Sequence, residues 1–142
     1  MQPARILPDL QFSVVCDQVR QEANGNFIVL GVMSFIAVPE VPVTAPALPV
    51  FNRWCSGIGQ FTETVRLVAP DLTTVVAKSD VKFALQDAAF NATNLNVLRE
   101  AELKATGVYH IEVLVDDVLK IRYPLHVVIP KLPPAQPARL PQ

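Results

Sequence analysis

Short runs in which apolar and polar side chains alternate recur along most of the chain, separated by turn residues. Such alternation is typical of strands with one buried face, and it predicts an all-β fold, an antiparallel sandwich of about 7–9 strands. The first run, from Leu10 to Asp17, predicts a strand whose apolar face consists of Leu10, Phe12, Val14 and Cys16.

Turn residues divide the first half of the chain into further strands. Asn24-Gly25 favours a tight hairpin turn, because both residue types accept positive φ angles. It joins the first strand to Phe27 to Ile36, which is apolar at nearly every position and predicts a central strand covered on both faces. Val50 to Ser56 and Gln60 to Val68 predict two more strands, and in the second of these Val65 and Leu67 point inward. Pro70-Asp71 predicts the turn that follows.

The next segments are less regular. Thr73 to Ala77 and Val81 to Leu85 predict a hairpin with Lys78-Ser79-Asp80 at its tip. The stretch from Asn94 to Ala105 fits either a short helix capped by Asn94 or a strand from Leu95 to Arg99. The strand is favoured, because every neighbouring element is β.

The apolar pattern of the last two predicted strands indicates how these strands pair. Tyr109, Ile111, Val113 and Val115 form one apolar row, and Leu119, Ile121, Tyr123, Leu125 and Val127 form the other. Residues that oppose each other across a ladder share a face, so odd-numbered positions pair with odd-numbered positions. A two-residue turn at Asp116-Asp117 violates this rule. The pattern therefore predicts a three-residue loop, Asp116 to Val118, or a bulge, with Val115 opposite Leu119 and Glu112 opposite Arg122.

Proline marks the segments outside the strands. The interpretation is an N-terminal arm over residues 1–9, a sandwich domain over 10–129 and a proline-rich C-terminal tail over 130–142, with a proline-rich surface loop over 40–50. The interface candidates in the loop and the tail are Val41, Pro42, Val43, Pro46, Leu48, Pro49, Leu132, Pro134, Pro137, Arg139 and Leu140.

Composition narrows the classes of function. Apolar residues make up 51% of the chain and charged residues 18%, with a net charge of -1. The sequence contains no stripe of basic residues of the kind that binds nucleic acid, so a nucleic-acid partner is not expected. The longest apolar run, Phe27 to Val38, is short of the roughly 20 residues that span a bilayer. The prolines at positions 3 and 8 interrupt any export signal, so a cytoplasmic location is expected. A chain with so high an apolar fraction and so few charged residues is expected to leave apolar surface exposed, which favours self-association.

Two segments resemble a known group of proteins. The opening segment carries Phe12, Cys16-Asp17, Val19-Arg20, Glu22, Asn24-Gly25-Asn26 and Leu30-Gly31-Val32, and the closing one carries Gly107, Tyr109, Glu112-Val113 and Val115-Asp116. Over about residues 10 to 128 the chain resembles a family of small uncharacterised bacterial β-sandwich proteins. The resemblance implies a sandwich similar to immunoglobulin or fibronectin type III modules, with no known activity. The immunoglobulin Cys…Trp…Cys spacing is missing, because Trp54 directly precedes Cys55.

No arrangement of residues predicts catalysis. Cys16 and Cys55 are interpreted as small core residues without a disulfide, and Asp17 as a turn or cap residue. In the expected register His110 faces Pro124 and His126 faces Val108, which places the two imidazoles diagonally on the outer face beside Glu112. A loose metal site there is the sharper hypothesis, and two solvated strand histidines are the simpler one. Pro134, Pro137 and Arg139 match a polyproline ligand with a basic anchor, although a stiff spacer has the same composition.

The sequence therefore favours a non-enzymatic structural or assembly module without a cofactor. It is expected to associate with itself through the terminal arms and the loop over 40–50. One alternative is a monomeric adaptor that binds another protein through the proline-rich tail or loop. The other is a metal-dependent enzyme at the His110 and His126 face.

Overall fold

The structure is a computed structural model that describes residues 5–131. Within that range every regular element is a strand, as the alternating pattern predicts. The strands are β1 (Asp9–Gln21), β2 (Phe27–Val32), β3 (Phe35–Ala37), β4 (Val43–Thr44), β5 (Leu48–Cys55), β6 (Gly59–Val68), β7 (Val75–Leu85), β8 (Asn91–Leu98), β9 (Glu102–Leu103), β10 (Gly107–Val115) and β11 (Val118–Val128).

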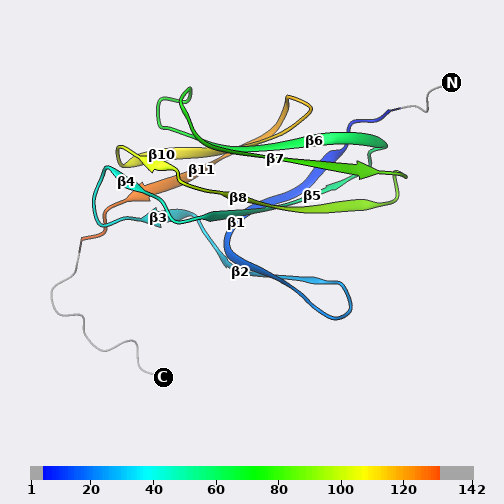
Figure 1. Ribbon diagram of the computed structural model, residues 1–142, viewed down its shortest axis with the longest axis horizontal. Coiled ribbons are helices and arrows are strands. Elements are labelled where there is room, and N and C mark those ends of the chain that lie inside the picture. Colours follow the sequence, from blue (N-terminus) through cyan, green and yellow to red (C-terminus); the bar gives the residue numbers. More distant parts are fainter. Residues whose placement is uncertain (1–4, 132–142) are drawn as a thin grey trace.

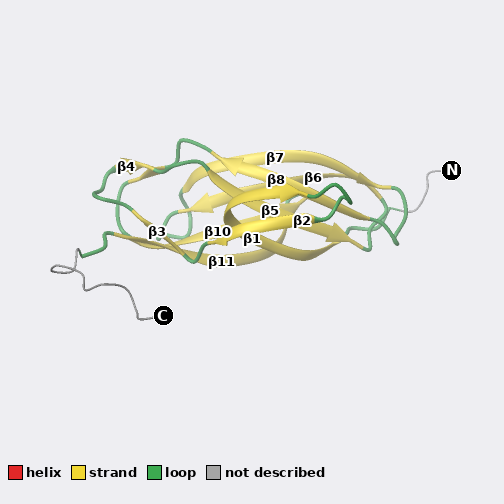
Figure 2. Ribbon diagram, turned by 90° about the horizontal axis from the view of Figure 1, so that it is seen from below, coloured by secondary structure: helices red, strands yellow, loops and turns green. Residues whose placement is uncertain are grey.

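Two main sheets enclose one apolar core. The first has the strand order β2-β1-β5-β8 and the second the order β3-β11-β10-β6-β7, while β4 and β9 form a small separate ladder. Figure 1 shows the two layers one above the other, and in Figure 2 most strands run along the long axis of the molecule. The core between the layers is made by inward side chains of both sheets, among them Leu48, Val50 and Trp54 from β5 and Val65, Ile111 and Leu125 from the second sheet.

The predicted apolar face of the first strand is wrong at Phe12 and Val14, whereas Cys16 is buried as predicted. The pairing of β1 with β5 shifts between Leu10 and Phe12, so that Gln11 is an extra residue in the ladder. A single inserted residue moves every later side chain to the opposite face. Ser13 and Val15 therefore face the core in place of Phe12 and Val14.

The predicted central strand from Phe27 to Ile36 is also wrong. The chain divides at Met33-Ser34 into β2, which pairs only with β1, and β3, which pairs in parallel with β11 in the other sheet. Both are edge strands. A turn is confirmed at Asn24-Gly25, but it is longer than the tight turn predicted, because Gln21 pairs with Phe27 and residues 22–26 connect the strands. Gly25 has a positive φ of 91°, whereas Asn24 does not have a positive φ.

The hairpin predicted at Lys78-Ser79-Asp80 does not form, because β7 runs without interruption through these residues. Lys78 and Asp80 lie on the outer face, where Asp80 accepts a hydrogen bond of 2.7 Å from the hydroxyl of Thr64. Ser79 faces inward and donates to Asn96 at 2.9 Å. The three polar residues thus follow ordinary strand alternation. The strand favoured for the ambiguous segment after residue 94 is confirmed by β8.

The last hairpin confirms the pairing of Glu112 with Arg122 and corrects the turn. The turn has two residues, Asp116 and Asp117, with φ 45° and 66°, so Val115 pairs with Val118 and not with Leu119. A register shift between Val113 and Leu114 restores the odd-to-odd pairing. The sequence offered a longer loop or a bulge, and the structure contains the bulge.

Candidate functional site

The most exposed apolar row of the structure lies on β2. Ile28, Leu30 and Val32 alternate along this strand and are 39%, 37% and 65% exposed, and Phe35 just beyond it is 55% exposed. One edge of β2 pairs with β1, and the other edge pairs with no strand among residues 5–131. The backbone groups along that free edge therefore have the geometry that accepts another strand.

The sequence of β2, FIVLGV, contains no charged residue and no proline. Charges and prolines are the usual means by which an edge strand avoids pairing with another chain. One edge strand of the second sheet, β7, is protected in this way, because Lys78, Asp80 and Lys82 project from it. The β2 edge is thus unlike the β7 edge.

The hairpin of β1 and β2 contacts an aromatic group on the outer face of the first sheet. The ring of Phe51 lies with its centroid 5.7 Å from that of Phe12 and 5.2 Å from that of Phe27. Phe51 is only 2% exposed as a result. Figure 1 shows this hairpin outside the two layers, on the side of the first sheet. The rings hold β2 in place while its own row of side chains stays exposed.

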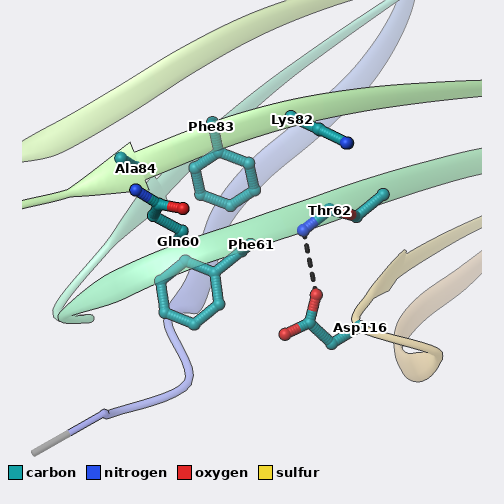
Figure 3. A pocket seen from close by; sticks show the side chains of 7 residues that line it. All are labelled: Gln60, Phe61, Thr62, Lys82, Phe83, Ala84 and Asp116. Atoms are coloured by element: carbon teal, nitrogen blue, oxygen red, sulfur yellow. Dashed lines mark hydrogen bonds between the residues drawn. The ribbon is translucent and has the colours of Figure 1, made fainter. Parts of the chain in front are cut away.

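A pocket of about 570 Å³ lies at one end of the second sheet, where the turn between β10 and β11 meets β6 and β7. Figure 3 shows its lining, which consists of Gln60, Phe61, Thr62, Lys82, Phe83, Ala84 and Asp116. The Asp116 carboxylate accepts a hydrogen bond of 2.9 Å from the backbone N–H of Thr62. The turn is therefore fixed to β6, and its carboxylate has a defined position.

The N-terminal arm reaches this pocket. The guanidinium of Arg5 donates to the Asp116 carboxylate and, at 3.0 Å, to the backbone carbonyl of Gln60. It also lies 4.7 Å from the ring centroid of Phe61. Ile6 forms an isolated antiparallel bridge with Ile58. The described part of the arm thus lies on its own chain, and sequence reasoning gave Arg5 no role.

A second group of polar residues lies inside the core. Glu63 is 0% exposed, and its carboxylate accepts hydrogen bonds from Trp54 Nε1, from Asn96 Nδ2 and, at 3.3 Å, from Asn94 Nδ2. Four strands contribute to the cluster, because Ser79 on β7 bonds to Asn96. This arrangement ties the two sheets together within the core.

The histidine face has the predicted register, with His110 opposite Pro124 and His126 opposite Val108. The adjacent Glu112 carboxylate is held by the guanidinium groups of Arg66 and Arg122, each at 2.5 Å. No group of three or more His, Cys, Asp or Glu side chains among residues 5–131 is placed to hold a metal ion. Glu112 is thus a partner of two arginines.

Both cysteines are free. Cys16 is buried, and burial, together with the neighbouring Asp17 carboxylate, raises the pKa of its thiol. A raised pKa disfavours the thiolate, which is the nucleophilic form. Asp17 itself does not lie in a turn, because it stands within β1 beyond the last residue that pairs with β5.

The interface candidates of the loop differ in their burial. Pro42 and Pro46 are exposed, and Val41, Val43 and Pro49 are half-buried. Leu48 is 0% exposed, so its side chain offers no surface, and both Leu48 and Pro49 belong to β5. The candidates of the tail, which are Leu132, Pro134, Pro137, Arg139 and Leu140, lie outside the described residues.

Comparison with known proteins identifies a family and no activity. No curated protein and no solved structure matches the chain. Residues 5–131 contain no helix that is long and apolar enough to cross a membrane. A family model matches residues 11–128, nearly the same span as the resemblance in the sequence. The chain therefore belongs to DUF6941, a family of unknown function.

Proposed function

We propose that this protein is a non-enzymatic assembly module with an immunoglobulin-like fold that associates with itself through β2. The observation that carries the proposal is the unprotected edge of β2 with its row of exposed apolar side chains. The partner strand is β2 of a second copy, in antiparallel orientation.

The strand order supports the immunoglobulin-like part of the proposal. β1, β5 and β8 take the places of strands A, B and E of that fold, and β6, β10 and β11 take those of C, F and G. The hydroxyl of Tyr109, near the start of β10, donates to the carbonyl of Ala105 at 2.8 Å. This contact is similar to the tyrosine corner of immunoglobulin domains, in which a tyrosine at the start of strand F bonds to backbone a few residues upstream.

Edge-to-edge pairing suits the chemistry of β2. Antiparallel pairing with a symmetric partner satisfies the free backbone N–H and C=O groups of both edges. It also places the row of Ile28, Leu30 and Val32 beside the same row of the second copy, so that apolar surface of both chains leaves water. Both contributions favour association, and neither depends on a ligand.

The assembly is tested by light scattering at several protein concentrations, with Val32→Lys as the main variant. A lysine at this position puts a charge on the exposed apolar row of β2, and charges on an edge strand disfavour pairing with another chain. We expect the mean mass of Val32→Lys to fall at least two-fold below that of the wild type at the same concentration. The wild-type protein is expected to gain mass as its concentration rises.

Phe90→Lys is the matched control, because Phe90 is 56% exposed and lies in the loop between β7 and β8, away from β2. It should associate as the wild type does. If Val32→Lys associates as strongly as the wild type, β2 is not the interface. A wild-type chain that stays monomeric at every concentration removes the proposal altogether.

A further inference from the structure

The contacts of Arg5 describe a binding site for a guanidinium group. A carboxylate, a backbone carbonyl and an aromatic face are the three partners that suit a planar cation with several N–H donors. Asp116, Gln60 and Phe61 supply one of each, and Phe61 is only 3% exposed. Lysine has a compact charge and no planar fork, so the site selects arginine.

The parts of this site are held in place independently of the arm. Besides the bond from Thr62 to the Asp116 side chain, the backbone N–H of Asp116 donates to the carbonyl of Thr62 at 2.9 Å. Gln60 and Phe61 are paired with Ala84 and Phe83 in the ladder of β6 with β7. The residues that hold the guanidinium are therefore fixed by the sheet and its turn, and three of those that line the pocket in Figure 3, Gln60, Phe61 and Asp116, contact Arg5.

The arm is incompletely covered on its own chain. Ile6 and Leu7, which follow Arg5, are 46% and 38% exposed. Their main attachment is the two backbone hydrogen bonds between Ile6 and Ile58, at 2.9 and 3.0 Å. The next residue, Pro8, is buried and packs against Gly57, where an added Cβ would lie 2.7 Å from the Cβ of Pro8. The chain is thus anchored at Pro8, and Ile6 and Leu7 carry apolar surface that their own chain leaves exposed.

We propose that Asp116, Gln60 and Phe61 form an arginine site for arm exchange, in which Arg5 of one copy binds these three residues of another. Exchange keeps every contact that the arm makes on its own chain, because the two copies are identical. It adds the burial of Ile6 and Leu7 between the copies. The inference shares with the proposed self-association only the need for a second copy. It uses the arm and the Asp116 site, whereas the proposed function uses the edge of β2.

A charge exchange between two full-length variants tests the proposal. Arg5→Glu places two acidic groups in its own pocket, and Asp116→Arg places two basic groups there. Neither variant can form the pair within one chain. In a mixture, the native Arg5 of the second variant meets the native Asp116 of the first, and the two substituted side chains form the same pair with its charges reversed. We expect the mixture alone to double in mass by light scattering.

Val32→Lys is included in both variants, so that β2 contributes nothing to the measured mass. Failure of arm exchange is then distinct from failure of the β2 interface, which is measured with the native arm and pocket in place. If both variants are folded by circular dichroism and the mixture keeps the mass of its separate components, arm exchange is wrong. Each of the two variants measured alone is the control and should keep the mass of a monomer.

A second measurement decides the case in which Asp116→Arg does not fold. Two populations of the Val32→Lys protein carry donor and acceptor fluorophores, and energy transfer is recorded after mixing. Arg5→Gln should lower the transfer to the level of unmixed samples. Arg99→Gln, which removes the same charge from an exposed position at the end of β8, should leave it unchanged. Equal transfer in the two variants, or none in the parent, overturns the proposal.

Discussion

The polar side chains buried in the core differ in how many hydrogen bonds they make. Glu63 receives three N–H donors, whereas Asn52, which is also 0% exposed, has no hydrogen-bond partner for Nδ2 or Oδ1 among the described residues. Asn52 lies between Ser13 on β1 and Asn94 on β8 in the ladder. A buried polar group without a partner loses its bonds to water and gains nothing in return. Asn52 therefore destabilises the fold, and Glu63 with its donors is satisfied.

This difference gives a prediction for two asparagines of similar burial. Asn52→Leu should raise the free energy of unfolding by about 1 kcal/mol, because the replacement removes an unpartnered amide. Asn96→Leu should lower it by about 2–4 kcal/mol, because it removes one donor to the Glu63 carboxylate and the acceptor of the Ser79 hydroxyl. Urea unfolding measures both values. A loss of stability in Asn52→Leu equal to that in Asn96→Leu would show that Asn52 has a partner in solution.

Among the elements, Glu112 joins three strands of the second sheet. It stands on β10, and its two guanidinium partners stand on β6 and β11. Burial by itself raises the pKa of Glu112, but the hydrogen bonds and charges of Arg66 and Arg122 outweigh it and hold the pKa below its ordinary value of 4.5. The carboxylate is therefore ionised in the folded protein at neutral pH, and its ion pairs hold the strands in register.

The lowered pKa gives a prediction for the pH dependence of stability. A carboxyl group whose pKa is lower in the folded state adds stability above its unfolded pKa, and this stability is lost as the pH falls through the folded pKa. At pH 7 Glu112→Gln should be less stable than the wild type by about 2 kcal/mol, since a charged acceptor is lost. The difference should shrink as the pH falls below 4.5. Thermal or urea unfolding over this pH range measures it.

Glu102→Gln provides the control for Glu112→Gln. Glu102 pairs with Lys104 at 3.9 Å, and both side chains are largely exposed. Exposed pairs of this kind contribute little to stability. This variant should therefore match the wild type at every pH, and a difference between Glu112→Gln and the wild type that does not change with pH would argue against the ion pairs as its source.

The elements also show where sequence patterns suffice. Alternation located β5, β6, β10 and β11 to within a few residues, because each has one face in the core. It failed for β1, because the bulge at Gln11 reverses the faces and no residue type marks such a bulge. It failed for β2 as well, because an exposed apolar edge and a buried central strand have the same composition. Only Gly31 and Ser34 interrupt that run.

Little of the candidate sites could be foreseen in this way. Glu63 gave a usable signal, because it shares its parity with Val65 and Leu67, which were predicted to point inward. The pocket gave none, since Arg5 and Asp116 are 111 residues apart in sequence and only the tertiary fold brings them together. Association through the arms therefore stays a prediction, and the contacts of Arg5 with Asp116 could not be foreseen from the sequence.

In the whole molecule, the two proposed interfaces together give a larger assembly than either interface gives alone. Pairing of β2 with its own copy is symmetric, and exchange of two arms is symmetric as well, so either surface alone closes a dimer. A molecule with both surfaces has two partners. It continues into a chain of alternating contacts, or it closes into a ring or a tetramer with two kinds of interface. The mass of the assembly therefore depends on how many of the two surfaces remain intact.

This argument predicts the masses of four proteins, measured by light scattering over a range of concentrations. The wild type should exceed the mass of a dimer at high concentration. Val32→Lys and Arg5→Gln should each stop at a dimer, because each keeps one symmetric interface. The combined variant should remain a monomer at every concentration, whereas Phe90→Lys with Arg99→Gln should match the wild type. A combined variant that still associates would require a third surface, and the exposed prolines of the loop over 40–50 would be the first to replace.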